Sequence, residues 1–256
     1  MNTVNIGLIG GCLATLNDVK KSELFFNLIK KDFQDKIKFR FKLGSYNNLS
    51  EIDKEFKRIQ SKDKIEILIL QIRPYIFLKN CRFYLRIKNK ISCNPLIFDK
   101  KNFIAIEELE EKLKNPLHLR LNNYIVKNEK NNFFKKFFSI YNINLLFGIL
   151  FRLNKALENY YIFYLNDLKR YCYQKGIKLI IHGPVNRTAF GLEPSILKSL
   201  TEKLESSNLS DIYSPTIEKN FKGHSVLFFD GEHINKFGHK LIAKKLNAKI
   251  RNLLLN

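Results

Sequence analysis

Short apolar runs alternate with longer amphipathic segments along most of the chain. Most of the short runs are nearly continuous in Ile, Leu and Val, which is typical of strands buried on both faces of a parallel sheet. One run instead alternates apolar with basic residues, as a half-buried strand does. The pattern predicts five strands, at residues 4–9, 36–43, 65–72, 177–181 and 211–213, the last a short edge strand.

The longer segments carry apolar residues at helical spacing. They predict helices at residues 17–31, 49–60, 133–175, 193–205 and 234–255. Gly176 is expected to end the third of these helices, because glycine readily adopts the left-handed conformation at a helix C-terminus.

Strands that alternate with helices imply crossover connections and a mainly parallel central sheet, hence a three-layer α/β/α sandwich. A single domain is expected to span 1–256, with an insertion or lid region around 81–140, where few periodic signals occur. Ligands of such sheets bind beyond the carboxyl ends of the strands. The residues at those ends should therefore converge on one edge: Gly10-Gly11-Cys12, Gly44, Arg73 and His182-Gly183.

The charge balance adds a preference for anions. The chain has 45 Lys and Arg against 24 Asp and Glu, a formal net charge of +21. Such an excess favours nucleic acid, acidic lipid or an acidic glycan as partner. Alternatively, it reflects lysine usage spread over the whole surface, which the wide distribution of the lysines favours. No RNP-like, C2H2 or basic-zipper pattern occurs, so we expect no dedicated nucleic-acid module.

The cysteines and the apolar runs indicate the compartment. The four cysteines are widely spaced and form no C-x-x-C pair, which argues against a disulfide scaffold or a zinc site. Residues 9–12 superficially resemble a lipoprotein cleavage box, but no Lys or Arg precedes the apolar stretch. No apolar run approaches the roughly 20 residues of a transmembrane helix. We therefore expect a soluble, cytoplasmic protein without a transmembrane segment.

The segment 228–239 carries the most specific chemistry. Asp230 precedes His233 by three residues on a predicted loop that leads into the last helix. A carboxylate in this position can bind the imidazole Nδ1, fix its tautomer and stabilise the imidazolium that forms when the histidine takes a proton. The run Asn235, Gly238, His239 follows directly. A D-x-x-H spacing alone is common by chance, whereas its combination with this run is much rarer.

These residues resemble the last signature block of the SGNH (GDSL-type) hydrolases, D-x-x-H followed by an N-x-x-G-H run. The first block of that family, a strand followed by G-D-S-L, is matched here by Gly10-Gly11-Cys12-Leu13, which puts Cys12 in the place of the nucleophilic serine. Gly44 matches the glycine of the second block. The third block, G-x-N-D, is replaced by Gln71-Ile72-Arg73-Pro74, so its oxyanion-binding asparagine is missing.

The resemblance implies a flavodoxin-like SGNH fold and a hydrolase or acyltransferase that acts on an ester or thioester. Cys12 would be the nucleophile, His233 the general base and acid, and Asp230 the residue that orients His233. Gly44 and the backbone N–H of Cys12 would hold the oxyanion, with Arg73 or Gln71 in place of the missing asparagine. No metal or organic cofactor is required. The substrate would be a small-molecule or glycan acyl ester, and the basic surface favours an anionic one. The oligomeric state is not specified.

Other interpretations remain open. The chain could be a non-catalytic binding protein with the same fold. A nucleotide-binding protein is suggested by the glycines after the first strand, although G-x-G-x-x-G is incomplete. His182 either lines the substrate pocket or makes a structural hydrogen bond. Arg73 either binds an anionic substrate group or pairs with a carboxylate.

Overall fold

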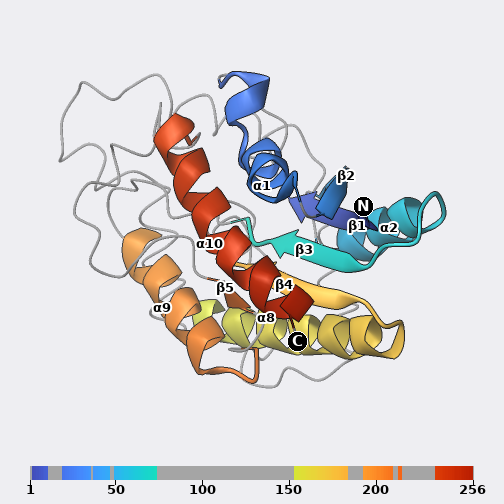
Figure 1. Cartoon of the computed structure of the whole chain (residues 1–256). Helices are drawn as coiled ribbons and strands as arrows, with labels where there is room; N and C mark the ends of the chain where they lie inside the picture. Colours follow the sequence, from blue (N-terminus) through green and yellow to red (C-terminus); the bar gives the residue numbers. More distant parts are fainter. Residues whose placement is uncertain are drawn as a thin grey trace, which may run out of the picture.

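A computed structural model gives the arrangement of most predicted elements (Figure 1). The residues that it describes are 2–10, 19–35, 37–46, 49–73, 153–183, 193–209, 213–214 and 234–255. The expected insertion around 81–140 lies outside these residues, and so do Cys12, Asp230 and His233. None of the helices in the described ranges is both long and apolar enough to cross a membrane.

The strands form one parallel sheet in the order β2-β1-β3-β4-β5. This order confirms the predicted three-layer α/β fold and is that of flavodoxin-like proteins. The strands are β1 (Asn2–Gly10), β2 (Ile37–Ser45), β3 (Ile67–Gln71), β4 (Lys178–His182) and β5 (Tyr213–Ser214). Every residue of β3 is buried, as its continuous apolar sequence predicts.

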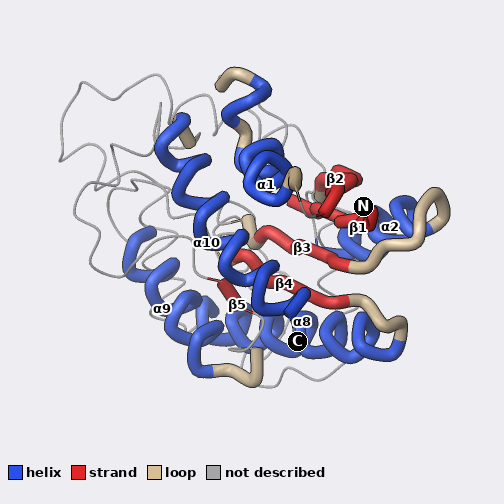
Figure 2. The backbone as a smooth tube through the Cα atoms, viewed as in Figure 1, coloured by secondary structure: helices blue, strands red, loops and turns tan. Residues whose placement is uncertain are grey.

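Helices cover both faces of the sheet, which appears as the red layer between blue helices in Figure 2. The chain moves from β1 to β2 in one direction along the sheet and from β2 through β3 and β4 to β5 in the other. Right-handed crossovers therefore put the first helix on one face and the next three on the other. The helices are α1 (Phe25–Phe33), α2 (Leu49–Gln60), α8 (Leu153–Gln174), α9 (Glu193–Ser206) and α10 (Lys236–Leu255).

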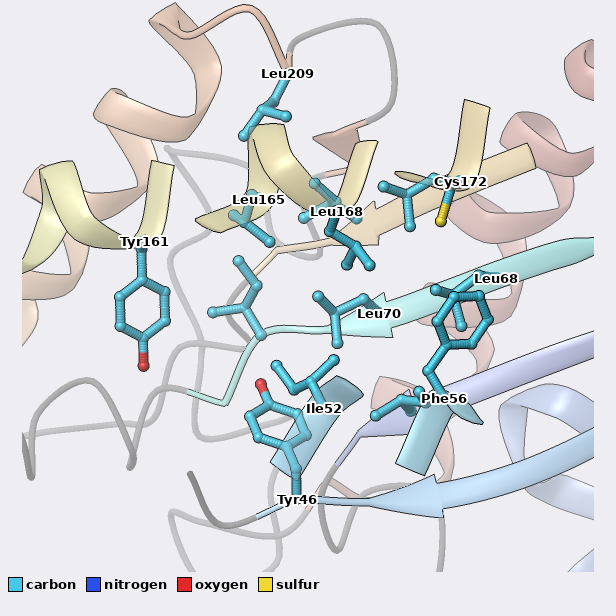
Figure 3. Packing of buried hydrophobic residues seen from close by; sticks show 14 of the residues in the cluster. Tyr46, Ile52, Phe56, Leu68, Leu70, Tyr161, Leu165, Leu168, Cys172 and Leu209 are labelled. Atoms are coloured by element: carbon cyan, nitrogen blue, oxygen red, sulfur yellow. The ribbon is translucent and has the colours of Figure 1, made fainter. Parts of the chain in front are cut away.

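Two apolar clusters form the core, one on each face. Alternate residues of each strand point to opposite faces, so Leu68 and Leu70 of β3 pack against α2 and α8, as Figure 3 shows. Ile67 and Ile69 point the other way and pack against α1 and α10. α10 thus covers the face that α1 alone would leave largely open.

Local backbone conformation sets the end of α8 and the start of α1. Gly176 has a φ of 66° and ends α8 as predicted. The N–H of Gly176 donates to the carbonyl of Tyr173 at 3.0 Å and that of Ile177 to the carbonyl of Cys172 at 2.8 Å, the pattern of a Schellman motif. The prediction for residues 17–31 was wrong at its start. A 3-10 turn (Lys21–Glu23) comes first, and Leu24 is extended, so α1 begins at Phe25.

Candidate functional site at the carboxyl edge of the sheet

The carboxyl ends of the strands bring four candidate site residues to one edge of the sheet. Gly10 ends β1, Tyr46 follows β2, Gln71 ends β3 and His182 ends β4. Because all strands are parallel, these ends lie on the same side. The strand order reverses between β1 and β3, and at such a switch point the connections that leave neighbouring strands diverge and open a crevice.

Gln71 and His182 form a buried polar pair at this edge. Gln71 Nε2 donates to His182 Nδ1 at 3.2 Å, and both side chains are fully buried. Burial, together with the nearby positive charge of Lys245, lowers the pKa of His182 to about 3. The ring is therefore neutral, and with Nδ1 as acceptor its proton lies on Nε2. Of the two predicted roles of His182, the structural hydrogen bond is observed.

The amide oxygen of Gln71, Oε1, lies against Gly10. A Cβ atom on Gly10 would come within 2.7 Å of Gln71 Oε1 and 3.2 Å of Gln71 Cβ. Glycine is thus required here because the Gln71 side chain fills the space beside β1. Oε1 is buried, and no donor to it occurs among the described residues.

Tyr46 is a site residue that the sequence did not reveal. Its hydroxyl donates to the carbonyl of Gln71 at 2.8 Å and accepts from the N–H of Arg73 at 3.1 Å. Its own N–H donates to the carbonyl of Gly10 at 3.3 Å. Burial raises the pKa of Tyr46 above its usual value, so the hydroxyl keeps its proton. Tyr46 follows a strand whose apolar residues alternate on the other face, and this local pattern gives no signal for it.

Arg73 is fixed beside Tyr46. Its Nη1 donates to the backbone carbonyl of Tyr46, and its Cζ lies 5.9 Å from the centre of the Tyr46 ring. A partly buried positive charge therefore stands at the end of β3, where the SGNH pattern has an asparagine. That Arg73 binds an anionic substrate group or pairs with a carboxylate stays a prediction.

Gly44 lies within β2 and pairs with Ile9 in the ladder. Its missing side chain lets α2 approach, since a Cβ would come within 2.9 Å of Glu55 Oε2 and 3.2 Å of Ile59 Cδ1. Alternate residues of a strand direct their N–H groups to the same side. The N–H of Gly44 therefore points to β1, as that of Tyr46 does.

The beginning of α10 lies at the same edge. Near its C-terminus, the carbonyl of Leu253 accepts a hydrogen bond from Lys178 at the start of β4. α10 consequently runs antiparallel to β4 and begins beside the carboxyl ends of the strands. Ile234, the residue directly after His233 in the sequence, is buried in the core cluster below α1 and α10.

The N-x-x-G-H run that follows His233 holds this helix start in place. The side-chain carbonyl of Asn235 accepts from the N–H groups of Phe237 at 2.9 Å and Gly238 at 3.2 Å, as an N-cap does. His239 Nδ1 accepts from the N–H of Phe25 at 3.3 Å, and the two rings are stacked. Burial lowers the pKa of His239 to about 4, so it is a neutral structural acceptor.

Comparisons with known proteins bear on the fold. No family model and no curated protein matches the sequence. Among solved structures, that of the protein TesA is 8% identical, with 97% of this chain and 99% of that chain covered and a TM-score of 0.50. An α/β hydrolase enzyme from the metagenome of Lake Arreo, Spain, is 9% identical, with 96% and 94% covered and a TM-score of 0.52.

A member of the lipolytic G-D-S-L family from Veillonella parvula is 9% identical, with 94% of this chain and 95% of that chain covered and a TM-score of 0.48. The chain shares the parallel α/β fold of TesA and of the Lake Arreo enzyme. Identities this low establish a shared fold alone.

In the described part of the chain, no group of three or more His, Cys, Asp or Glu side chains could hold a metal ion. Cys172, the cysteine in that part, is buried between α8 and the sheet, and burial raises the pKa of its thiol to about 12. It is therefore an inert core residue.

Proposed function

We propose that the protein is an SGNH-type ester hydrolase or acyltransferase in which Cys12, His233 and Asp230 are the catalytic residues. The observation that carries the proposal is that β1 ends and α10 begins at one edge of the sheet. Cys12 follows Gly10 by two residues, and His233 directly precedes Ile234. Two residues of chain span at most about 7 Å, so a nucleophile at Cys12 stays close to this edge.

The proposed reaction uses side chains alone. The Cys12 thiolate attacks the acyl carbonyl, and the tetrahedral intermediate collapses to a thioester as His233 protonates the leaving alcohol or thiol. His233 then takes a proton from water, or from an acceptor alcohol, which attacks the thioester and releases Cys12. Asp230 orients the His233 ring and stabilises its charged form.

The oxyanion requires donors at the same edge. We assign the backbone N–H of Cys12 and the guanidinium of Arg73, because Arg73 stands where the family has its asparagine and is held there by Tyr46. Gln71 supports the floor of the site through Gly10. That Gly44 supplies an N–H stays a prediction, and its position in the ladder weighs against it.

The positive charge of Arg73 at the site edge suggests a class of substrate. We propose a small-molecule or glycan acyl ester with an anionic group, since the positive charge of Arg73 at this edge also attracts an anion close to the reacting carbonyl. Comparing esters of succinic and butyric acid would test this. A preference for the succinyl ester that Arg73→Gln removes would support the assignment.

Hydrolysis of p-nitrophenyl butyrate and of a butyryl thioester tests the catalytic proposal. We expect Cys12→Ala and His233→Ala to lose nearly all turnover, and Asp230→Asn to lose less, because the histidine remains. Cys172→Ala is the matched control and should keep its activity. Wild-type protein without turnover, or turnover that survives Cys12→Ala, would contradict the nucleophile assignment.

Alkylation provides a second measurement. In a variant in which Cys81 and Cys93 are serine, Cys12 and Cys172 remain. Iodoacetamide should label Cys12 and abolish turnover. Cys172 should not react, because it is buried and its raised pKa keeps it in the thiol form. The labelling rate of Cys12 should fall in His233→Ala, because a neighbouring imidazolium favours the thiolate.

One observation favours a second candidate, a binding protein without turnover. The asparagine of the family is replaced by Arg73, whose guanidinium is already engaged by the Tyr46 carbonyl. If saturable binding of an acylated glycan occurs without hydrolysis, and Arg73→Gln weakens that binding, this second candidate replaces the first.

A further inference from the structure

The charges of the described helices are segregated between the two faces of the sheet. α10 contains six basic residues and no acidic residue, and its neighbour α1 contains two basic residues and one acidic residue. The helices of the other face, α2, α8 and α9, contain eight basic and eight acidic residues together. One face is therefore strongly cationic, and the opposite face is balanced. An even spread of lysine over the surface does not produce this difference.

Five of the cationic side chains on this face are exposed. We define the basic face as the exposed residues Lys31, Lys236, Lys240, Lys244 and Arg251. Lys236, Lys240 and Lys244 follow at four-residue spacing, so they form a stripe with about 6 Å between successive residues. The stripe to Arg251 extends over about 22 Å of the helix. Arg251 lies over the ring of Phe33 at 5.1 Å and joins the stripe to α1.

The two helices that carry the basic face lie next to each other. Near the N-termini of both helices, Phe25 contacts His239, and Asn247 in the middle of α10 donates to Asp32 near the C-terminus of α1. α1 and α10 therefore run parallel and side by side, in front of the sheet in Figure 1. Asp32, the acidic residue of this pair of helices, is engaged by Asn247. Their apolar sides are packed against the sheet, so charge dominates the outer side.

We propose that the basic face binds the surface of an anionic lipid membrane. A cationic surface is complementary in charge to an anionic membrane, and each lysine close to an anionic bilayer increases binding about fivefold. Phe237, which is 51% exposed beside Lys236, adds an aromatic side chain at the end of the stripe. A site for single-stranded nucleic acid would instead combine a groove with several exposed aromatic rings for base stacking.

The orientation has a consequence for the candidate site. α10 begins at the carboxyl edge of the sheet, so Lys236 and Phe237 border the site, while Arg251 lies toward the opposite edge. A protein bound through this face keeps the edge with Gly10, Gln71 and Arg73 beside the membrane. The membrane contact requires no catalysis, and it stands or falls independently of the proposed hydrolase function.

Vesicle co-sedimentation tests the proposal. The full chain is mixed with vesicles of phosphatidylcholine alone or of phosphatidylcholine with about a third phosphatidylglycerol. We expect binding to the anionic vesicles alone at about 0.1 M salt and its loss at about 1 M salt, where the Debye length falls from about 10 to about 3 Å. Replacing Lys236, Lys240 and Lys244 by Gln should weaken binding about a hundredfold, at about fivefold for each lysine.

The matched control has the same charge change on the other face. Lys54, Lys57 and Lys203 are exposed on α2 and α9, and their replacement by Gln should leave vesicle binding within about twofold. Circular dichroism verifies that both variants are folded. If the triple variant of α10 does not fold, the pair Lys240→Gln and Lys244→Gln should still reduce binding about twentyfold.

Three results would overturn the proposal. The first is wild-type protein that does not bind anionic vesicles, and the second is an equal loss of binding in both triple variants. The third is tighter binding to single-stranded DNA than to vesicles, abolished by the α10 variant. Cys12→Ala should bind vesicles like wild type, so a failed hydrolase assay and a failed membrane proposal remain distinguishable.

Discussion

Gln71 Nε2 donates a hydrogen bond to Nδ1 of His182 across the ends of β3 and β4, at 3.2 Å. The bond requires a neutral imidazole, because a protonated ring has no acceptor. It also fixes the amide so that Oε1 lies against Gly10 at the end of β1. The two residues are 111 positions apart, and together they connect three of the strands that form the site edge.

The neutral His182 should make the stability depend on pH. Its pKa is lowered to about 3 in the folded protein, whereas an unfolded histidine titrates near 6.5, so the unfolded chain binds more protons between these values. Stability is complete above about pH 6.5 and decreases as the pH falls toward about 3. At about pH 5 the loss from this group is on the order of 2 kcal/mol. Urea unfolding at several pH values measures it.

Replacing the histidine separates this contribution from others. His182→Gln should be less stable at neutral pH, but its stability should decline less between about pH 6.5 and about pH 5. His239, whose pKa is also lowered, should act in the same direction, so the double variant with His239→Gln should be the least pH-dependent. An unchanged slope in His182→Gln would refute the assignment.

Gly10→Ala should destabilise the fold by about 1–3 kcal/mol, because the new Cβ overlaps Gln71 Oε1 and crowds Gln71 Cβ. Removing the amide relieves the overlap, so the same substitution should cost less in a Gln71→Ala background. A double-mutant cycle of urea unfolding measures this coupling. Gly7→Ala is the control. Its Cβ would meet Leu68 Cδ1 at 3.3 Å instead of Gln71, so its cost should be the same with and without the Gln71 amide. Additive costs at residues 10 and 71 would contradict the contact.

Tyr46→Phe should reduce the free energy of unfolding by about 1–3 kcal/mol, because it leaves a buried carbonyl of Gln71 and the N–H of Arg73 without the hydroxyl. Turnover should also fall if Arg73 helps to hold the oxyanion. Tyr173→Phe, on a residue that is 86% exposed, is the matched control and should change neither quantity. Equal stability of the two variants would show that the Tyr46 hydroxyl contributes little.

Asn235→Ala removes the cap of α10 and should cost about 1 kcal/mol of stability. Because the cap fixes the helix start next to His233, we expect kcat to fall more than the substrate KM rises. Asn235→Asp keeps an acceptor oxygen and should restore both stability and kcat. If Asn235→Ala loses stability and keeps full kcat, the cap does not position the catalytic histidine.

The strands and most of the helices could be predicted because their patterns are local. The buried face of each element is written in its own sequence, and a continuous apolar run such as that of β3 indicates burial on both sides. The start of α1 could not be predicted in this way. Leu24 fits the helical spacing, and it is extended because the chain must turn from the preceding 3-10 segment to place Phe25 against His239.

The site was only partly predictable from the sequence. His182 was identified as a strand end and Gln71 as a candidate oxyanion residue, but their contact was not predicted, and Tyr46 was missed. Such contacts depend on which strands are neighbours and on which face each side chain emerges. The segments with Cys12, Asp230 and His233 lie outside the described residues, so their catalytic roles remain predictions.

The sequence by itself determined the alternation of strands and helices, the strand ends that carry polar residues and the SGNH resemblance of both chain ends. The tertiary structure alone decided that Gln71 joins Gly10 to His182 and that the basic residues of α1 and α10 share one face. The physical reason is that residue pattern encodes what each element buries, whereas the order of the strands determines which distant elements meet. The six basic residues of α10 and the two of α1 thereby come to lie on one face of the sheet.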